Sequence, residues 1–169
     1  MTDVSPQIKA LATIGNVCLQ YSLLEISLAH VLWAMLDLDD ERGAIVTGGA
    51  DLKARLGMAI ALAEHMRAPY EIKKRLKAIR EDFRKKDLAE RRNQAVHGAQ
   101  RTTGAATTFT MLRWKKPRRN EEVPVESLYD LGRELNRLSE EAHKVFLAIG
   151  TWRFGEGAEI DGADDLSIG

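Results

Sequence analysis

Cysteine is nearly absent from this sequence, in which Cys18 is the only one among 169 residues. A single cysteine cannot form a disulfide within the chain, and in its helical apolar surroundings we expect it to be a small core residue. The four prolines, the 44% of hydrophobic residues and the 30% of charged residues are typical of a soluble globular protein. We therefore expect a folded protein in a reducing cytoplasm.

Long apolar runs are absent as well. No continuous apolar stretch approaches the roughly 20 residues that cross a membrane, and residues 1–6 contain no basic region followed by an apolar one. We therefore expect no membrane association and no secretory signal. The length favours one domain over residues 1–153, followed by an acidic, glycine-rich tail at residues 154–169 that we predict to be disordered.

The common motifs of metal and cofactor sites are missing too. The chain has no GxGxxG before a helix, no Walker A run, no zinc-like spacing of Cys and His, no HExxH and no nucleophile elbow. We therefore expect neither a metal nor a cofactor. Of the four histidines, His30 and His143 have no polar cluster nearby in the sequence, and His65 is predicted to lie on the surface.

Neither sign of charge is in excess over the whole chain, but the charges are unevenly distributed. Residues 71–119 contain 16 Lys and Arg and 5 Asp and Glu, out of 25 of each kind, which leaves 9 basic and 20 acidic residues elsewhere. A basic middle flanked by acidic ends is typical of a site that binds a polyanion. A long exposed helix with mixed charges explains the same distribution equally well.

Apolar residues at helical spacing predict four main helices. Ser5 and Pro6 form a helix-start signal, and Gly98 is placed as a helix stop. The first helix is apolar on most sides, which indicates a central helix or one that packs against a second subunit. The predicted helices run from residue 5 to about 38, from 51 to 67, from 69 to about 98 and from 124 to about 152.

The helical period is lost between residues 99 and 123. Residues 107–114 predict a strand that pairs with residues 100–103 through a turn at Gly104. The expected fold is therefore all-α, an up-down four-helix bundle with a short β-hairpin-like insertion between the third and last long helices.

Three polar residues lie near the end of the third predicted helix. Asn93 and His97 are four residues apart and share one helix face, with Arg92 on the adjoining flank. An imidazole titrates near neutral pH, so it can take the proton of a ribose 2′-OH or give one to a leaving oxygen. A guanidinium can hold a phosphate as negative charge develops, and an amide can orient either partner. Metal-free cleavage of RNA requires groups of these kinds.

Residues 92–98, RNQAVHG, resemble the Arg-(four to six residues)-His motif of the HEPN superfamily, in the form in which Asn follows the Arg. The setting is similar as well, because the motif falls late in a long helix, after a long first helix with a lone Glu and before one more long helix. The resemblance covers roughly residues 5–153 and is sharp only at the motif. It implies a helical bundle that forms a homodimer and joins two motif helices into one composite, metal-independent endoribonuclease site.

The resemblance also implies a role for each motif residue. Arg92 would stabilise the phosphate, His97 would be the acid or base, and Asn93 would position them, leaving a 2′,3′-cyclic phosphate and a 5′-OH. Such domains occur in toxin–antitoxin and phage-defence systems, which implies an antitoxin or regulatory protein as a partner. In one toxin group a tyrosine two residues after the His is modified by the antitoxin. This chain departs from that pattern, because Ala99 stands there.

Two other interpretations of the motif remain open. The chain is equally compatible with a non-catalytic HEPN-like helical module that binds RNA, nucleotide or a protein partner. It is also compatible with an assembly protein in which the motif is structural. Arg92 would then form an ordinary salt bridge, His97 would be a histidine favoured at a helix C-terminus by the macrodipole, and Asn93 would be solvated.

Glu25 is a candidate supporting residue, because it lies on the apolar stripe of the first predicted helix. A shielded carboxylate needs a partner. One hypothesis is that Glu25 orients Arg92 or lies beside His97. The other is a structural ion pair with a different arginine, such as Arg55 or Arg80.

A basic loop follows the predicted hairpin and combines cations with an aromatic ring. RNA-binding proteins use such pairs for backbone contacts and base stacking, although a charge-rich surface hairpin is the more frequent explanation. The candidate RNA-binding residues are Arg113, Trp114, Lys115, Lys116, Arg118 and Arg119.

Overall fold

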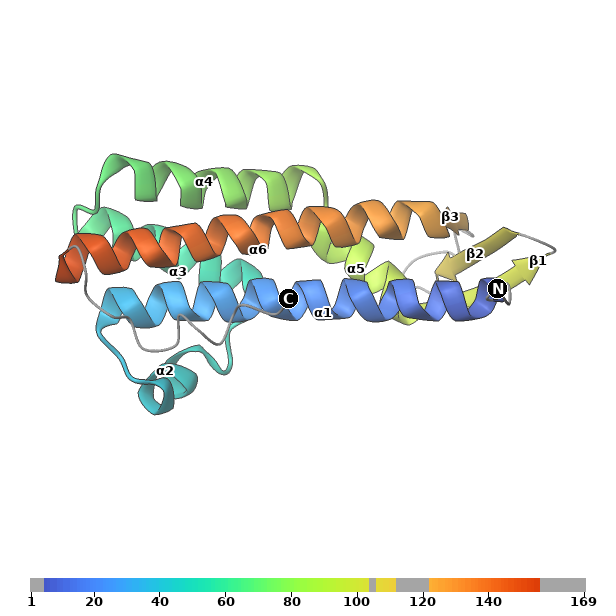
Figure 1. Cartoon of the computed structure of the whole chain (residues 1–169), viewed down its shortest axis with the longest axis horizontal. Helices are drawn as coiled ribbons and strands as arrows, with labels where there is room; N and C mark the ends of the chain where they lie inside the picture. Colours follow the sequence, from blue (N-terminus) through green and yellow to red (C-terminus); the bar gives the residue numbers. More distant parts are fainter. Residues whose placement is uncertain (1–4, 104–105, 112–121, 156–169) are drawn as a thin grey trace. The chain divides into compact units, whose positions relative to one another are not determined.

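Figure 1 shows the computed structural model of the chain, which describes residues 5–103, 106–111 and 122–155. Contacts between residues divide the chain into two compact units. Unit 1 consists of residues 1–23 and 82–138, and unit 2 consists of residues 24–81 and 139–169. Three long helices contribute residues to both units: α1 (Pro6–Leu36), α4 (Tyr70–Lys85) and α6 (Val125–Phe154).

The described residues are mostly helical, which confirms the predicted predominance of α-helix. The other helices are α2 (Asp40–Thr47), α3 (Leu52–His65) and α5 (Leu88–His97). Three short strands are present as well: β1 (Gly98–Thr103), β2 (Ala106–Met111) and β3 (Glu122–Pro124). The predicted basic loop lies outside the described residues, and so do residues 156–169 of the predicted disordered tail.

Helix α1 is long and apolar enough to cross a membrane over Gln7–Leu36, judged by length and composition. The sequence-based expectation counted only uninterrupted apolar runs, whereas this helix contains scattered polar residues such as Asn16 and Gln20. In its most apolar window, 39% of the residues are buried inside the structure. A core helix of a soluble protein and a signal sequence near an N-terminus both have these properties.

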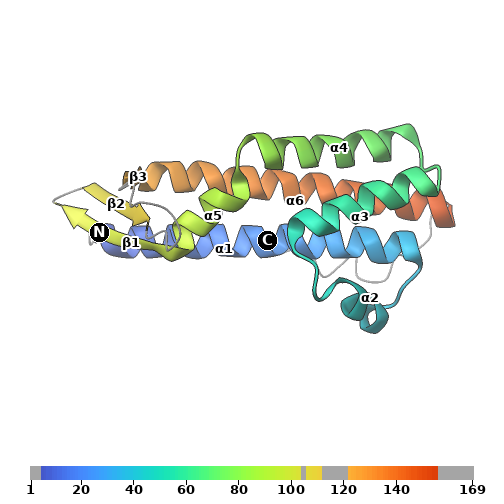
Figure 2. The ribbon, with the colours of Figure 1, turned by 180° about the vertical axis from the view of Figure 1, so that it is seen from behind.

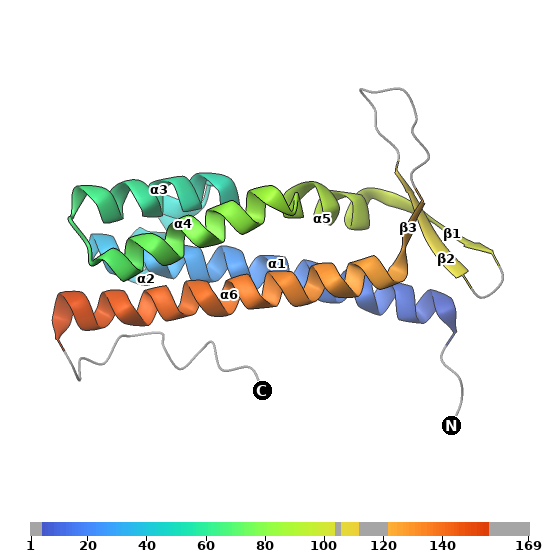
Figure 3. The same cartoon turned by 90° about the horizontal axis from the view of Figure 1, so that it is seen from above.

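The core of unit 1 is formed by apolar side chains on α1, α5 and α6. Val17 of α1 is fully buried, and so is Leu88 of α5. The first half of α6 contributes leucines spaced by three or four residues: Leu128, Leu131, Leu135 and Leu138. The helices α1 and α6 approach closely, because a Cβ atom at Gly132 would lie 2.7 Å from Asn16 Nδ2. In Figure 3 the first halves of α1 and α6 run side by side.

A small antiparallel sheet belongs to unit 1 and has the strand order β1-β2-β3. Gly98 of β1 pairs with Met111 of β2, and Phe109 of β2 pairs with Val123 of β3. β1 follows α5 directly, and β3 continues directly into α6. The sheet therefore connects the end of the motif helix to the start of α6. The predicted turn at Gly104 lies outside the described residues.

The prediction of one uninterrupted helix from residue 69 to about 98 was wrong, because the chain breaks between α4 and α5. Asp87 adopts a left-handed conformation with φ of 48°, and its backbone N–H donates to the carbonyl oxygen of Arg84 at 3.2 Å. Aspartate tolerates this conformation better than most residues. No glycine or proline marks the break, so the helical period continues across it in the sequence. The break gives α5 an axis of its own.

Unit 2 contains a second apolar core, and Figure 2 shows the ribbons of its helices α2 and α3 from behind. Its buried side chains come from α1, α3, α4 and α6 and include Leu24, Leu28, Leu32, Leu52, Leu56, Leu76, Ile79, Val145 and Ile149. Arg55 of α3 crosses to two backbone carbonyls, donating from Nη1 to Glu25 O at 2.7 Å and from Nη2 to Thr47 O at 3.1 Å. This arginine links α3 to α1 and to the end of α2.

Helix α2 was not predicted from the sequence. It begins after Asp39, whose side chain accepts the backbone N–H of Arg42 at 2.8 Å and caps the helix. Only Gly43 and Thr47 of α2 are buried, so the helix has no apolar stripe to reveal it. Trp33 of α1 donates its indole N–H to Thr47 Oγ1 at 3.1 Å. Gly43 lies against the same indole ring, where an added Cβ would overlap it.

We predict that Gly43→Ala destabilises the protein by about 1–3 kcal/mol, because the methyl group overpacks the contact between α2 and Trp33. The matched control is Gly57→Ala on α3, where a Cβ meets nothing within 4 Å. Replacing this helical glycine should stabilise the protein by about 0.5–1 kcal/mol. Urea unfolding at pH 7 measures both. Equal stabilities for the two variants would contradict the packing of α2 against Trp33.

Candidate functional site

The motif residues lie on α5 in unit 1, and the helical periodicity places their side chains on different faces of the helix. Leu88 and Ala95 are buried and define the inner face of α5. Arg91 and Arg92 flank this face and are half-buried. Asn93 and His97 are exposed on the outer face, one turn apart. The structure therefore brings Arg92 and Asn93 together and places His97 at the solvent-exposed end of the same helix.

Arg91 connects α5 to the start of α6 by a hydrogen bond. Its Nη2 donates to the backbone carbonyl of Ser127 at 2.9 Å, and Ser127 Oγ donates to the carbonyl of Pro124 at 2.8 Å. A buried or half-buried carbonyl at a helix start is well satisfied by a charged donor. The sequence offered no signal for this contact, because Arg91 differs from its neighbour only in the direction of its side chain. The contact fixes the rotation of α5 and, with it, the direction of Arg92.

No carboxylate among the described residues pairs with Arg92. Its Nη1 donates to Asn93 Oδ1 at 3.2 Å. Its Cζ lies 5.1 Å from the ring centroid of Tyr21 on α1. Its Nε is shielded from solvent and has no hydrogen-bond partner in the described part of the chain. A guanidinium in this environment retains donors that an added anion can satisfy.

Three other arginines of unit 1 have their charge or their donors matched within the described residues. Arg137 binds Glu134 and also Asp82, whose Oδ2 lies 2.5 Å from Arg137 Nη2. Arg133 pairs with Asp130, and Arg91 binds the Ser127 carbonyl. Arg92 differs from these three arginines, because its described partners are one amide oxygen and one aromatic ring. The bidentate edge of a guanidinium suits a phosphate, so Arg92 is the best-prepared anion ligand of the motif.

His97 is the last residue of α5 and is exposed. No hydrogen bond to its imidazole occurs within the described residues. Solvent access on this face would allow the ring to exchange protons with a bound substrate or with water.

Glu25 belongs to unit 2, whereas the motif belongs to unit 1. Its backbone carbonyl, rather than its carboxylate, accepts from Arg55. The side chain is half-buried, and its carboxylate forms no ion pair within the described residues. The hypothesis of a structural ion pair with Arg55 or Arg80 is therefore not supported among the described residues. The hypotheses that Glu25 orients Arg92 or lies beside His97 stay predictions, because the two units are not placed relative to one another.

The candidate residues of the basic loop lie outside the described residues: Arg113, Trp114, Lys115, Lys116, Arg118 and Arg119. Ala99, at the position of the modified tyrosine in one toxin group, lies in β1 and pairs with Thr110 of β2. The RNA contact predicted for the loop remains a prediction.

Part of the basic middle of the sequence is neutralised by an ion-pair cluster in unit 1. Glu134 accepts from Arg137 Nε at 3.0 Å and from Lys86 Nζ at 2.6 Å, and its side chain is only 19% exposed. The hydrogen bond from Arg137, followed by that from Lys86, lowers the pKa of Glu134 below its ordinary value of 4.5 despite opposing desolvation. The local excess of positive charge is therefore smaller than the sequence count suggests.

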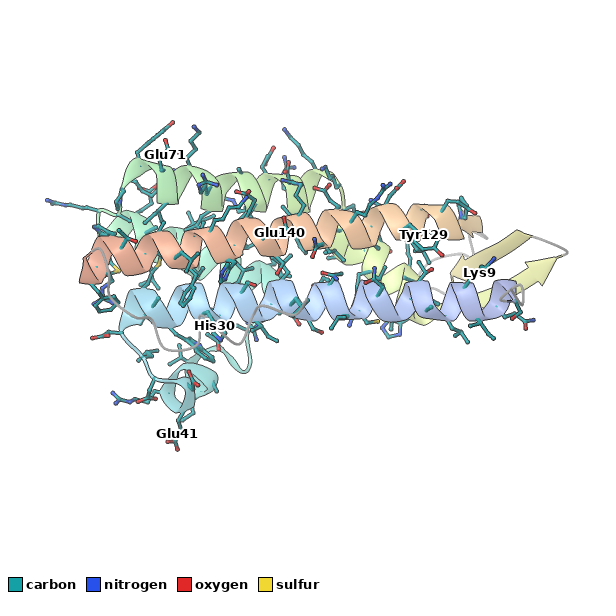
Figure 4. The ribbon with its side chains drawn as sticks, viewed as in Figure 1. Lys9, His30, Glu41, Glu71, Tyr129 and Glu140 are labelled. Carbon is teal, nitrogen blue, oxygen red and sulfur yellow. The ribbon has the colours of Figure 1, made fainter. Side chains whose placement is uncertain are left out.

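Two tyrosines of unit 1 were not predicted as site residues. Tyr21 appears in the sequence as one apolar-stripe residue of the first helix, and nothing local links it to Arg92. Tyr129 is exposed on α6 and is labelled in Figure 4, together with Lys9 of α1. An exposed tyrosine in the same unit as the motif offers a ring on which a base can stack. Tyr129 could have been found from the sequence, because it is an aromatic residue at an outward-facing position of the last predicted helix.

Comparisons with known proteins do not assign a family. No protein-family model, curated protein or solved structure matches the chain. Within the described residues, no group of three or more His, Cys, Asp or Glu could hold a metal ion. The geometry of α5 and the sequence motif are therefore the features that indicate a function.

We predict that Glu134→Gln lowers the free energy of unfolding at pH 7 by about 1 kcal/mol, because Arg137 and Lys86 lose their shared carboxylate. The folded-state pKa of Glu134 is lowered, so its stabilisation is present above the ordinary pKa of 4.5 and is lost as pH falls through the lowered value. Urea unfolding at several pH values should show the difference from wild type shrinking below pH 4.5. Glu126→Gln, an exposed change on the same helix, is the control. A difference that is the same at all pH values would contradict the ion-pair cluster.

Proposed function

We propose that this protein is a metal-independent endoribonuclease of HEPN type, with Arg92, Asn93 and His97 as its catalytic residues. The observation that carries the proposal is the state of Arg92. It is half-buried and stacked on Tyr21, it lacks a carboxylate partner in the described residues, and it lies beside Asn93. A partly desolvated cation without a counter-charge favours binding of an anion. The exposed imidazole of His97 on the same short helix adds a group that can transfer protons.

The proposed reaction uses only groups of the chain and of the RNA. An imidazole of His97 removes the proton of a ribose 2′-OH, and O2′ forms a bond to the adjacent phosphorus. The bond from phosphorus to the 5′-oxygen breaks, and that oxygen leaves with the electron pair and takes a proton from a second imidazole, which is in its protonated form. Arg92 stabilises the negative charge on the phosphate oxygens. The products are a 2′,3′-cyclic phosphate and a 5′-OH.

The proposal includes a homodimer, because the reaction employs two imidazoles and each chain supplies one His97. Asn93 and His97 lie on the exposed face of α5, so two α5 helices that meet across a two-fold axis would form the composite site.

The proposal also includes an up-down four-helix bundle with a β-hairpin-like insertion, a cytoplasmic location and a role in a toxin or phage-defence system with a regulatory partner. Ala99 argues against regulation by modification of a tyrosine at that position.

A second candidate is a non-catalytic module that binds RNA, nucleotide or a protein partner. One observation favours it, namely that the His97 imidazole has no hydrogen-bond partner within the described residues to fix its orientation. Catalytic bases are usually oriented by a third group. The two candidates differ in whether RNA is cut or only bound.

We predict that the purified full chain cleaves a labelled RNA oligonucleotide and that cleavage survives excess EDTA. His97→Ala should lower the rate about 10²–10⁴-fold, because the acid–base group is lost. Arg92→Ala should lower it about 10²–10³-fold, because charge on the phosphate is no longer stabilised. Time courses at saturating enzyme measure the rate, and analysis of the product ends tests for the cyclic phosphate.

The matched control is His65→Ala, because His65 is also an exposed histidine at the end of a helix, α3. This variant should cleave like wild type. RNA that binds tightly without being cut would support the second candidate instead. Cleavage at an unchanged rate in both His97→Ala and Arg92→Ala would contradict the assignment of the site.

A further inference from the structure

Tyr21 contacts both a cation and a second ring in unit 1. Its ring centroid lies 5.1 Å from Arg92 Cζ and 6.4 Å from the ring centroid of Phe83, with the two rings inclined at 49°. Phe83 belongs to α4 and is buried, and Tyr21 is half-buried on α1. Tilted ring pairs at this separation are attractive. Phe83 therefore restrains the ring on which the guanidinium of Arg92 lies.

An aromatic ring holds a guanidinium differently from a carboxylate. A carboxylate neutralises the cation and takes the N–H donors along its edge. A ring attracts the cation through its face and leaves the edge donors free. Of the Arg92 donors, Nη1 binds Asn93 Oδ1 and Nε has no partner within the described residues. The combination fixes the plane of the guanidinium while it keeps donors and charge available for an anion.

We propose that Tyr21 is the positioning residue of an anion site at Arg92, and that its ring orients the guanidinium toward a phosphodiester group of a bound RNA. The inference rests on the proposed function for the identity of the anion. The Tyr21 ring sets the orientation of the Arg92 guanidinium, whichever anion binds there. Tyr21 acts through Arg92 and does not itself contact the phosphate.

The structure contains a matched pair that separates this role from a general contribution of tyrosine. Tyr70 of α4 also lies under a cation, with Lys74 Nζ 5.9 Å from its ring centroid. Tyr70 is 71% exposed and belongs to unit 2. Its pairing with Lys74 lies within one turn of α4 and is open to solvent. Loss of the Tyr70 ring should therefore leave anion binding by unit 1 unchanged.

The test measures binding of a 2′-O-methyl RNA oligonucleotide by fluorescence anisotropy, because this probe keeps the phosphates and cannot be cleaved. The variants are Tyr21→Phe, Tyr21→Leu and Tyr70→Leu, each made in the wild-type and in the Arg92→Ala background. Tyr21→Met, a second non-aromatic change with a flexible side chain, replaces Tyr21→Leu if the latter unfolds. Thermal melting of each variant establishes that binding is compared among folded proteins.

We expect Tyr21→Leu to weaken binding about 2- to 30-fold, the range that loss of a cation–π contact gives. Tyr21→Phe keeps the ring and should bind within about twofold of wild type. In the Arg92→Ala background, Tyr21→Leu should cause no further loss, because the group that it orients is gone. Tyr70→Leu should bind like wild type.

Three results would overturn the inference. The first is binding of Tyr21→Leu with wild-type affinity. The second is a loss of affinity in Tyr21→Phe as large as that in Tyr21→Leu. The third is an effect of Tyr21→Leu that persists in full in the Arg92→Ala background. Wild-type protein that does not bind the oligonucleotide overturns the anion site itself. Wild-type protein that binds this probe but leaves unmodified RNA intact defeats the proposed ribonuclease activity, while the binding series still decides the role of Tyr21.

Discussion

Burial of an almost uncharged helix is the constraint on which the rest of the structure depends. Between Lys9 and Asp37, helix α1 carries a single acidic or basic side chain other than histidine, that of Glu25. Its fully buried residues include Val17 in unit 1 and Leu24 and Leu28 in unit 2. The hydrophobic effect requires other elements to cover these residues in each unit. In unit 1, α5 and the first half of α6 supply much of the remaining apolar core.

The inner face of α5 places two neighbouring arginines in different environments. Leu88 and Ala95 enter the core, and the arginines beside them are half-buried. Arg91 satisfies the carbonyl of Ser127, whereas Arg92 lies on Tyr21. Two adjacent arginines thus differ in role. Arg91 binds α5 to the start of α6, and Arg92 retains N–H donors that an anion can accept. The proposed function depends on this difference.

The sequence predicted the long helices α1, α3 and α6 to within a few residues, because their apolar residues recur at the helical period. It did not predict α2, which buries only two residues. It also did not predict the break at Asp87, because the helical spacing of apolar residues continues in the sequence although the backbone of Asp87 is left-handed. The motif residues on α5 were identified from their spacing alone. The contact between Tyr21 and Arg92 was not, because it joins residues far apart in the chain and depends on how α5 is rotated.

The most direct test of the central claim is the side-chain Nε–H resonance of Arg92 in ¹⁵N–¹H NMR spectra, assigned by its loss in Arg92→Lys. The account predicts that this resonance shifts and saturates as uncleavable 2′-O-methyl RNA is added, because the guanidinium binds a phosphate. The Nε–H resonance of Arg91, assigned in the same way, should move much less, because that side chain already binds the Ser127 carbonyl. An Arg92 resonance that stays in place while the RNA binds elsewhere would contradict the account.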